Sequence, residues 1–163
     1  MWGNRRQEAE SPAAGAVFIK RGLLLFWSIW ITLVVITNVA GELRALHLAS
    51  WLAPLASGNF RYILKETSAY SLPWWIDQIL FIGILLWESL SAVLFWRAFR
   101  HAWRGTGRRL RAAYTAHGVL MALFAAFILA DEIFHDFRVE GDHRSIVALL
   151  IVSLLAIGLL PER

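Results

Sequence analysis

The sequence predicts an all-α protein, a four-helix transmembrane bundle with short interfacial helices in its first outer loop. Of the 163 residues, 58% are hydrophobic and only 17% are charged, which leaves too little polar surface for a soluble domain of this length. Four stretches approach the roughly 20 apolar residues that a helix needs to cross about 30 Å of hydrocarbon. We therefore expect a single integral membrane domain over residues 1–163.

The spans are expected at about residues 22–41, 75–97, 112–131 and 145–161. The first is longer than the apolar core of a signal peptide, so we expect it to be retained. The second begins after Pro73 with Trp74 and Trp75, which suit an aromatic belt at the membrane surface. The third runs up to Asp131 without a formal charge. The fourth has almost no polar side chain besides Ser153, so we expect it to face lipid or a partner protein.

The outer loop, residues 42–74, is expected to contain two short helices. Its first half mixes leucines with His47 and a basic residue, a pattern typical of an interfacial helix or of a continuation of the first span. Pro54 interrupts that pattern. Asn59 is then expected to cap a second short helix over residues 60–65.

Lysine and arginine are distributed unevenly around the spans, which predicts cytoplasmic termini and a cytoplasmic loop at residues 98–111. The expected cytoplasmic side holds eleven of the 16 basic residues: Arg5, Arg6, Lys20, Arg21, Arg97, Arg100, Arg104, Arg108, Arg109, Arg111 and Arg163. The other side holds Arg44, Arg61, Lys65, Arg138 and Arg144. The net charge of +4 therefore reflects membrane topology, and we expect no nucleic-acid partner. The expected location is a bacterial inner membrane.

Five arginines of the cytoplasmic loop are also candidates for holding anionic lipid headgroups, because each basic residue near the surface contributes about 1 kcal/mol. They are Arg100, Arg104, Arg108, Arg109 and Arg111. The orientation signal alone would explain the same residues equally well.

Glu88 lies near the middle of the second span, where a carboxylate costs at least about 2.5–3.5 kcal/mol. We expect a neutral carboxyl that faces the bundle interior, in an intramembrane polar cluster with Ser91, Thr32, Ser28, His117 and Tyr114. The cluster could serve only to hydrogen-bond the helices together. Alternatively, Glu88 could accept protons or bind a lipid headgroup, a quinone or an ion. We favour the first interpretation.

Asp131, Glu132 and His135 have the spacing by which one helix presents ligands to a metal. A di-iron bundle would need a second E-x-x-H motif, and a zincin would need histidine at position 131. Other residues on the outer side could complete a mixed nitrogen and oxygen site: His47, Glu42 and His143. The alternative is an ordinary polar outer surface, and we predict no stoichiometric transition metal.

Cysteine is absent, which excludes a disulfide, a thiol nucleophile, an iron–sulfur cluster and Cys-bound zinc. Haem b between two helices would need histidines at matching depths, and His117 has no obvious intramembrane partner of that kind. We predict no cofactor, with haem b or quinone as alternatives.

Short motifs occur in order along the chain: Asn38 at the end of the first span, Asn59-Phe60-Arg61-Tyr62-Ile63-Leu64 in the outer loop, Glu88, Asp131-Glu132-Ile133-Phe134-His135-Asp136-Phe137 after the third span, and Leu160-Pro161-Glu162 after the fourth. In these motifs the chain resembles a family of small bacterial four-span integral membrane proteins of unknown function. The resemblance extends over nearly the whole chain. It implies the four-span architecture and supplies no reaction.

The small size, the short loops and the lack of a catalytic constellation lead us to expect no enzyme. The expected function is that of a small accessory or stabilising subunit of a larger membrane complex, with anionic lipid and other membrane subunits as partners. The alternative is a small-ligand membrane protein that uses Glu88 to bind a proton, a quinone, a lipid or haem b.

Overall fold

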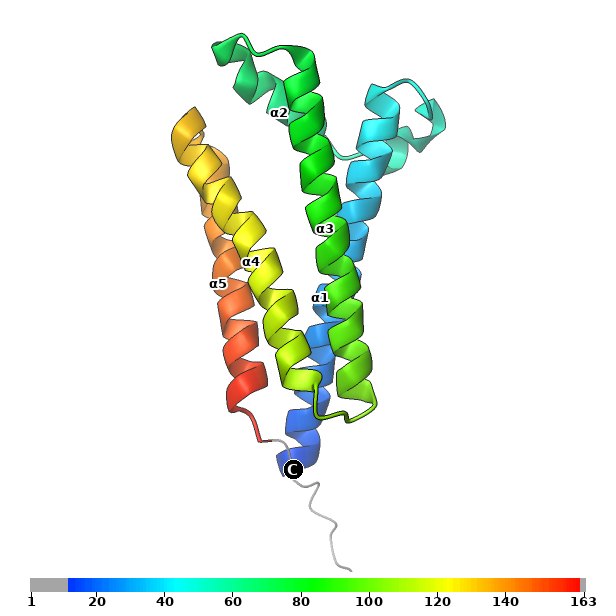
Figure 1. The fold of residues 1–163 in the computed structure, drawn as a ribbon, viewed down its shortest axis with the longest axis vertical. Coiled ribbons are helices and arrows are strands. Elements are labelled where there is room, and N and C mark those ends of the chain that lie inside the picture. The colour runs from blue at the N-terminus through cyan, green and yellow to red at the C-terminus, as the bar shows by residue number, and fades with distance from the viewer. Residues whose placement is uncertain (1–11, 162–163) are drawn as a thin grey trace, which may run out of the picture.

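A computed structural model describes residues 12–161, and this part of the chain contains helices and no strand. Four long helices form the bundle (Figure 1): α1 (Pro12–Ala45), α3 (Trp74–Trp103), α4 (Arg109–Phe134) and α5 (Phe137–Leu159). All four are long and apolar enough to cross a membrane. The predicted all-α four-helix bundle is confirmed. The basic residues Arg5, Arg6 and Arg163 and the motif residue Glu162 lie outside the described range.

The helices extend beyond the predicted spans. With 34 residues at 1.5 Å each, α1 is about 51 Å long, well above the thickness of the hydrocarbon core. The start of α5 at Phe137, rather than near residue 145, has a local cause. Asp136 caps this helix by accepting a hydrogen bond from the backbone N–H of Arg138 at 3.2 Å. Apolar patterning locates the hydrocarbon-crossing part of a helix and misses such polar ends.

The segment between α1 and α3 contains a 3-10 helix, η1 (Ser50–Leu55), then α2 (Asn59–Thr67) and a short turn, η2 (Ser68–Tyr70). Short helices were predicted here, but Asn59 is not the cap of α2. The cap residue is Gly58, which offers no side-chain hydrogen bond. Phe60 in the first turn of α2 is buried, and its ring lies 5.3 Å from the ring of Phe81 on α3.

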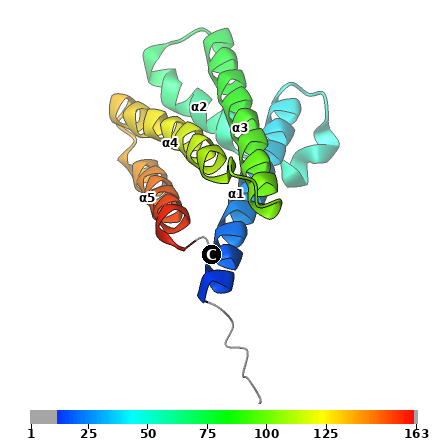
Figure 2. The ribbon, with the colours of Figure 1, turned by 60° about the horizontal axis from the view of Figure 1, so that its bottom comes forward.

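The four long helices form two pairs. α3 packs against α1 on one side and α4 on the other, and α4 packs against α5. The α1/α3 pair and the α4/α5 pair diverge toward one end of the bundle, where α2 lies between them (Figures 1 and 2). We call this the acidic end, formed by the last turns of α1, the segment 46–73 and the α4–α5 turn. The opposite or basic end comprises the first turns of α1, the α3–α4 connection and the last turns of α5.

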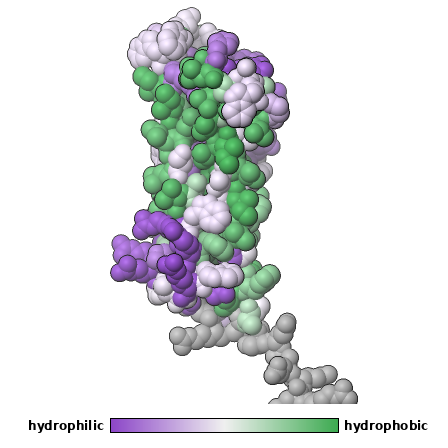
Figure 3. Space-filling view, turned by 90° about the vertical axis from the view of Figure 1, so that its right-hand side faces the viewer, coloured by the Kyte–Doolittle hydropathy of each residue, from purple (hydrophilic) through white to green (hydrophobic). Residues whose placement is uncertain are grey.

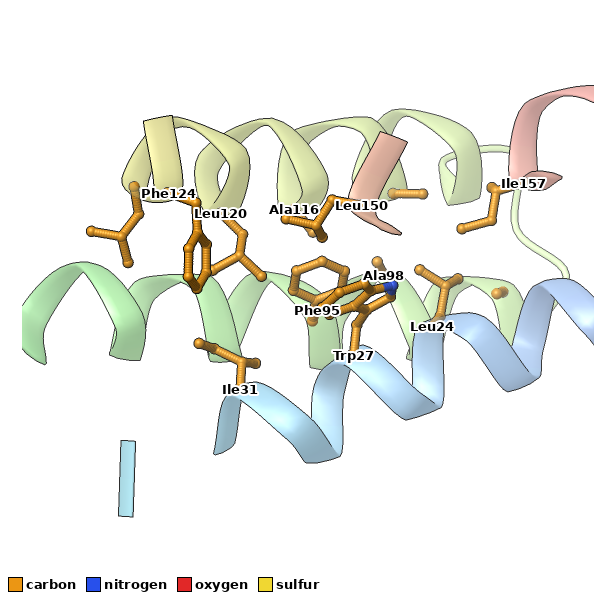
Figure 4. Close-up of a cluster of buried hydrophobic side chains, with 13 residues drawn as sticks. Leu24, Trp27, Ile31, Phe95, Ala98, Ala116, Leu120, Phe124, Leu150 and Ile157 are labelled. Atoms are coloured by element: carbon orange, nitrogen blue, oxygen red, sulfur yellow. The ribbon is translucent and has the colours of Figure 1, made fainter. Parts of the chain in front are cut away.

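On the face shown in Figure 3, apolar side chains occupy the middle of the molecule and hydrophilic ones gather toward both ends. Inside, an apolar cluster extends from mid-bundle to the basic end (Figure 4) and includes Leu24, Trp27, Ile31, Phe95, Ala98, Ala116, Leu120, Phe124, Leu150 and Ile157. Trp27 stacks on Phe95 with ring centroids 6.2 Å apart. Because lipid tails are as apolar as these side chains, close packing and interhelical hydrogen bonds hold the helices together.

Candidate functional site at the acidic end

A cavity of about 250 Å³ lies at the acidic end, between the diverging helix pairs and against α2. Its polar lining consists of Asn38, Asn59, Tyr62, Glu66, Thr67, Glu88, Asp131, Asp136 and His143. Its apolar lining consists of Ile63, Leu80, Phe81, Ile84, Phe127, Ala130 and Phe134. The α3 residues of the wall span positions 80–88, about 12 Å along the helix axis at 1.5 Å per residue. Glu88 is therefore at the base, nearest the bundle centre.

The base of the cavity is formed by a hydrogen-bonded pair from α1 and α3. The amide Nδ2 of Asn38 donates to both carboxyl oxygens of Glu88, each at 2.9 Å. Both side chains are buried, with 1% of Asn38 and 4% of Glu88 exposed. Since an unpartnered polar group is costly inside a membrane, this pair ties α1 to α3 at the depth of Glu88.

The other end of the Asn38 amide is also occupied. Its Oδ1 accepts from Ser57 Oγ at 2.6 Å and from Asn59 Nδ2 at 2.8 Å. Asn38 therefore joins the intramembrane carboxyl to the loop before α2 and to the first turn of that helix. This orientation satisfies both sides of the amide, because its NH₂ group donates to Glu88 and its Oδ1 accepts from the loop.

Gly41 permits the loop to approach α1 this closely. The backbone N–H of Ser57 donates to the carbonyl of Thr37 at 2.9 Å. A Cβ atom at position 41 would lie 2.9 Å from the carbonyl oxygen of Ser57. A side chain at this position would have to displace the loop.

Two further pairs line the wall formed by α2, α4 and α5. Tyr62 of α2 donates its hydroxyl proton to Asp136 Oδ2 at 2.5 Å. Burial, followed by this hydrogen bond, raises the pKa of Tyr62, and the same hydrogen bond is the main cause that lowers the pKa of Asp136. His143 Nδ1 on α5 lies 2.6 Å from Asp131 Oδ2 on α4. These two pairs join the α2 segment to the α4–α5 turn and α4 to α5.

The predicted cluster around Glu88 is wrong in its partners. Ser28, Thr32 and Ser91 each donate to a carbonyl one turn earlier in their own helix, at 2.7, 2.6 and 2.9 Å. Thr32 also accepts from Trp96 Nε1 at 3.0 Å, which sets the register of α1 against α3. In antiparallel helices with that register, Ser28 and Thr32 lie deeper toward the basic end than Glu88 does.

The two predicted partners on α4, His117 and Tyr114, also lie too far toward the basic end to reach Glu88. His117 is fully buried with its ring 4.9 Å from Phe95, two turns from Glu88 along α3. Its Nδ1 lies 2.9 Å from the carbonyl of Ala113 and its Nε2 lies 3.1 Å from Ser153 Oγ. Both ring nitrogens therefore have protein partners, which leaves neither for haem iron without a rearrangement. Tyr114 is half exposed and contacts α5 beside Gly158.

The outer-side residues proposed for a metal do not converge. Glu132 is exposed, with Arg144 Nη2 at 3.8 Å, and Asp131 pairs with His143 instead. His135 ends α4 in the left-handed conformation at φ 57°, which turns it away from the helix face on which its spacing placed it. His47 is exposed in the α1–η1 turn. No group of three or more metal-ligating side chains that could hold an ion occurs within residues 12–161.

The arginines proposed for lipid headgroups lie on and beside the α3–α4 connection at the basic end. Arg100, Arg104, Arg108 and Arg111 are exposed, and Arg109 is half-buried. The first four are therefore accessible to a surrounding anionic surface.

Residues that the sequence patterns did not assign to a site complete the cavity. Asn38 interrupts an apolar run, as Glu88 does, and two isolated polar residues in neighbouring spans are a signal for a pair. Ser57 and Tyr62 carry no comparable signal, because polar residues are common in loops. Comparisons of the chain with protein-family models, with curated proteins and with solved structures found no match.

Proposed function

We propose that this protein binds a small molecule in the acidic-end cavity and that Glu88 is the group at the base that holds it. The observation that supports this function is a buried carboxyl, in the middle of a membrane-spanning helix, that lines a cavity of about 250 Å³. Ionisable side chains inside spans are costly and usually face a functional cavity or a partner. Helix-to-helix hydrogen bonding alone would not require a cavity beside the pair.

The lining favours a ligand with an apolar body and one positively charged or hydrogen-bond-donating group. Four carboxyl groups line the cavity and no lysine or arginine does: Glu66, Glu88, Asp131 and Asp136. The rings of Phe81, Phe127 and Phe134 supply faces that attract cations and apolar groups. The volume lies just below the roughly 300–1,000 Å³ of typical ligand pockets, which favours a small molecule.

Three probes with the same ring test this proposal: benzylamine, benzyl alcohol and benzoate. We expect the detergent-solubilised protein to bind benzylamine most tightly and benzoate least, as measured by ligand-observed NMR. Glu88→Gln should weaken benzylamine binding roughly 10- to 150-fold, because a hydrogen bond to a charged group contributes about 1.5–3 kcal/mol. Binding of benzyl alcohol should change much less.

Glu132→Gln is the matched control for that experiment. Glu132 is exposed at the same end of the bundle and does not line the cavity. An equal loss of benzylamine binding in both variants would show general charge attraction and would contradict the proposal. Tight binding of benzoate would contradict the assigned ligand class.

Proton transfer across the membrane is a weaker candidate. On the basic-end side of Glu88, the described interior is filled by apolar side chains such as Ile31, Phe95 and Leu120. Ser91 and His117, the nearest buried polar groups of α3 and α4 in that direction, hydrogen-bond elsewhere. Glu88 is thus connected by polar groups to the acidic end alone within the described chain.

For topology, we propose that the acidic end faces outward from a bacterial inner membrane and that the basic end is cytoplasmic. The distribution of lysine and arginine supports this orientation. The chain contains no cysteine, so a thiol reagent can label only a cysteine introduced at a chosen position. In intact cells, Leu48→Cys should react with an impermeant thiol reagent and Arg108→Cys should not. The opposite result would reverse the orientation.

Membership of a larger membrane complex is a second proposal, and the exposed face of α5 supports it. Leu149, Val152 and Leu155 are all more than half exposed on that helix, which has the lowest buried share of the four spans. Lipid would cover this face as well as a partner would. Purification in mild detergent with mass spectrometry separates the two. A defined larger particle would support the complex, and a particle containing only the 18.5 kDa chain would contradict it.

A further inference from the structure

We infer that the basic end of the bundle binds a phosphate group of an anionic phospholipid in a cleft beside Lys20. Lys20 belongs to α1, and only 8% of it is exposed. Its Nζ is buried and has no hydrogen-bond partner among residues 12–161. A buried ammonium is stable only when an anion or acceptor compensates it, so this arrangement calls for a compensating group from outside residues 12–161, and an anion compensates the charge best.

Within residues 12–161, the cavity beside Lys20 is lined by positive charge and by no acid. Lys20, Arg21 and Arg109 line a small cavity of about 30 Å³ between α1, α3, α4 and α5, and no carboxylate is in its lining. This volume suits one or two oxygen atoms and excludes a whole headgroup. A phosphate whose oxygen entered the cavity would therefore leave the rest of the lipid outside the bundle.

Arg21 is held in place beside Lys20. Its Nε donates to the carbonyl of Ala102 and its Nη2 to that of Trp103, both at 3.2 Å. Its guanidinium carbon also lies 5.2 Å from the ring centroid of Trp103. A second positive charge is thus fixed at the cavity by contacts to the end of α3, so little side-chain entropy is lost when an anion binds.

The remaining lining explains why the phosphate should belong to a lipid. Val17, Leu24, Leu110 and Ile157 surround the basic groups with apolar surface. Lys20 and Arg21 immediately precede the long apolar run of α1, at the level where headgroups meet hydrocarbon. Apolar surface next to clustered basic groups at this depth matches the glycerol and phosphate region of a phospholipid. A free phosphate ion has no apolar group that could contact these four side chains.

Thermal unfolding with added lipid tests this inference. We expect phosphatidylglycerol to raise the Tm of the detergent-solubilised protein in a saturable way, and phosphatidylcholine or millimolar inorganic phosphate to have little effect. In phosphatidylcholine alone, Lys20→Met should have a higher Tm than the wild type, because it removes the uncompensated charge. The same variant should lose the response to phosphatidylglycerol.

Arg108→Met is the matched control, because Arg108 is exposed at the same end and does not line the cavity. Loss of one basic residue from a surface that attracts anionic lipid costs about 1 kcal/mol, or about fivefold in affinity. The loss of affinity for phosphatidylglycerol should be larger than about fivefold in Lys20→Met and no larger than about fivefold in Arg108→Met. Equal losses would overturn the site in favour of general surface attraction.

Lysine acetylation tests the same site in the unaltered chain. The sequence has two lysines, Lys20 and Lys65, and the side chain of Lys65 is 72% exposed. Because Lys20 Nζ is buried and Lys65 is exposed, Lys20 should be acetylated much more slowly than Lys65, and phosphatidylglycerol should slow the acetylation of Lys20 further while leaving that of Lys65 unchanged. Equal protection by inorganic phosphate would assign the site to free phosphate, and no selective protection of Lys20 would overturn it.

Discussion

Asn38 at the acidic end makes a set of hydrogen bonds that other small polar residues could not make. Its NH₂ group donates to the Glu88 carboxyl, and its Oδ1 accepts from Ser57 and Asn59. An aspartate of the same shape could not donate from the Glu88 side unless it were protonated. A serine would be too short to reach α3 and the loop together. The position therefore requires a donor on one side and an acceptor on the other.

Exchanging the two groups of the pair tests this requirement. Asn38→Asp should destabilise the bundle by about 1–2 kcal/mol, because two carboxyl groups would face each other in the membrane. Adding Glu88→Gln should recover part of that loss, since the new amide on α3 can donate to the carboxyl introduced on α1. The free energy of unfolding in mixed micelles of increasing dodecyl sulfate content measures both effects. A double variant no more stable than Asn38→Asp would contradict the pairing.

The Tyr62–Asp136 hydrogen bond should make stability depend on pH. It lowers the pKa of Asp136 below the ordinary value of about 3.9, so its contribution is present above that pH and is lost as the pH falls through the folded-state pKa. Burial and the same contact raise the pKa of Tyr62 above about 10, so the contribution is also lost at strongly alkaline pH.

Tyr62→Phe is the corresponding variant, because it removes the hydroxyl and keeps the ring. The pKa of Asp136, followed by carboxyl ¹³C NMR, should rise in this variant toward its ordinary value. The difference in stability between wild type and variant should be constant near neutral pH and should shrink below about pH 4. An unchanged pKa of Asp136 would show that the hydrogen bond does not form in solution.

At the scale of helices and loops, Gly41 controls where the η1–α2 segment lies against α1. The contact that a Cβ would make is with backbone, the carbonyl oxygen of Ser57 at 2.9 Å, which cannot move without the loop. Since Ser57 also donates to Asn38, the loop position and the cavity base are coupled. A substitution here should alter the site while leaving the four spans intact.

We expect Gly41→Ala to displace Ser57 and to weaken benzylamine binding several-fold without loss of helix content. Gly83→Ala is the control, because a Cβ at Gly83 on α3 would meet no atom within 4 Å. That variant should be neutral or more stable by up to about 1 kcal/mol, since alanine favours helix over glycine. Circular dichroism and the NMR binding assay compare the two. Equal binding by both variants would contradict the coupling.

Ser153 joins three helices at the opposite half of the bundle. Since the carbonyl of Ala113 can only accept, His117 Nδ1 must donate to it, and in the neutral ring Nε2 then accepts from the Ser153 hydroxyl. Ser153 Oγ in turn accepts from Trp27 Nε1 at 3.0 Å. The fourth span was expected to face lipid or a partner because it is apolar. Ser153 in this span instead faces inward and connects α5 to α1 and α4.

Ser153→Ala should lower the free energy of unfolding by about 1–3 kcal/mol, because it leaves Trp27 Nε1 and His117 Nε2 buried without partners. Ser145→Ala is the control. Ser145 is exposed on the same helix and donates to the carbonyl of Gly141 in its own helix. Its replacement should change stability by less than about 0.5 kcal/mol. Similar losses in the two variants would contradict the three-helix link.

For the whole molecule, the fold could be predicted from the sequence because one physical constraint dominates it. In hydrocarbon every backbone polar group must be satisfied within the chain, so four long apolar stretches form four helices. The short α3–α4 and α4–α5 connections then place these three helices side by side. The helix ends could not be predicted equally well, because the polar turns beyond the hydrocarbon are stabilised by local caps such as Asp136.

The site was only partly predictable for a geometric reason. Glu88 could be recognised as a buried carboxyl from its position alone. Its partner depends on the register of α1 against α3, and a shift of two turns exchanges Asn38 for Thr32. Apolar patterning does not determine that register. The cavity depends further on the divergence of the helix pairs and on α2 between them, which are tertiary features without a local sequence signal.

The divergence of the two helix pairs has a mechanical consequence for the surrounding bilayer. The bundle is wider at the acidic end, where α2 separates the pairs, than at the basic end, where the helices converge (Figures 1 and 2). A protein of this tapered shape displaces more lipid from one leaflet than from the other. Its free energy of insertion therefore depends on membrane curvature, and it is lowest where the leaflet around the acidic end is stretched.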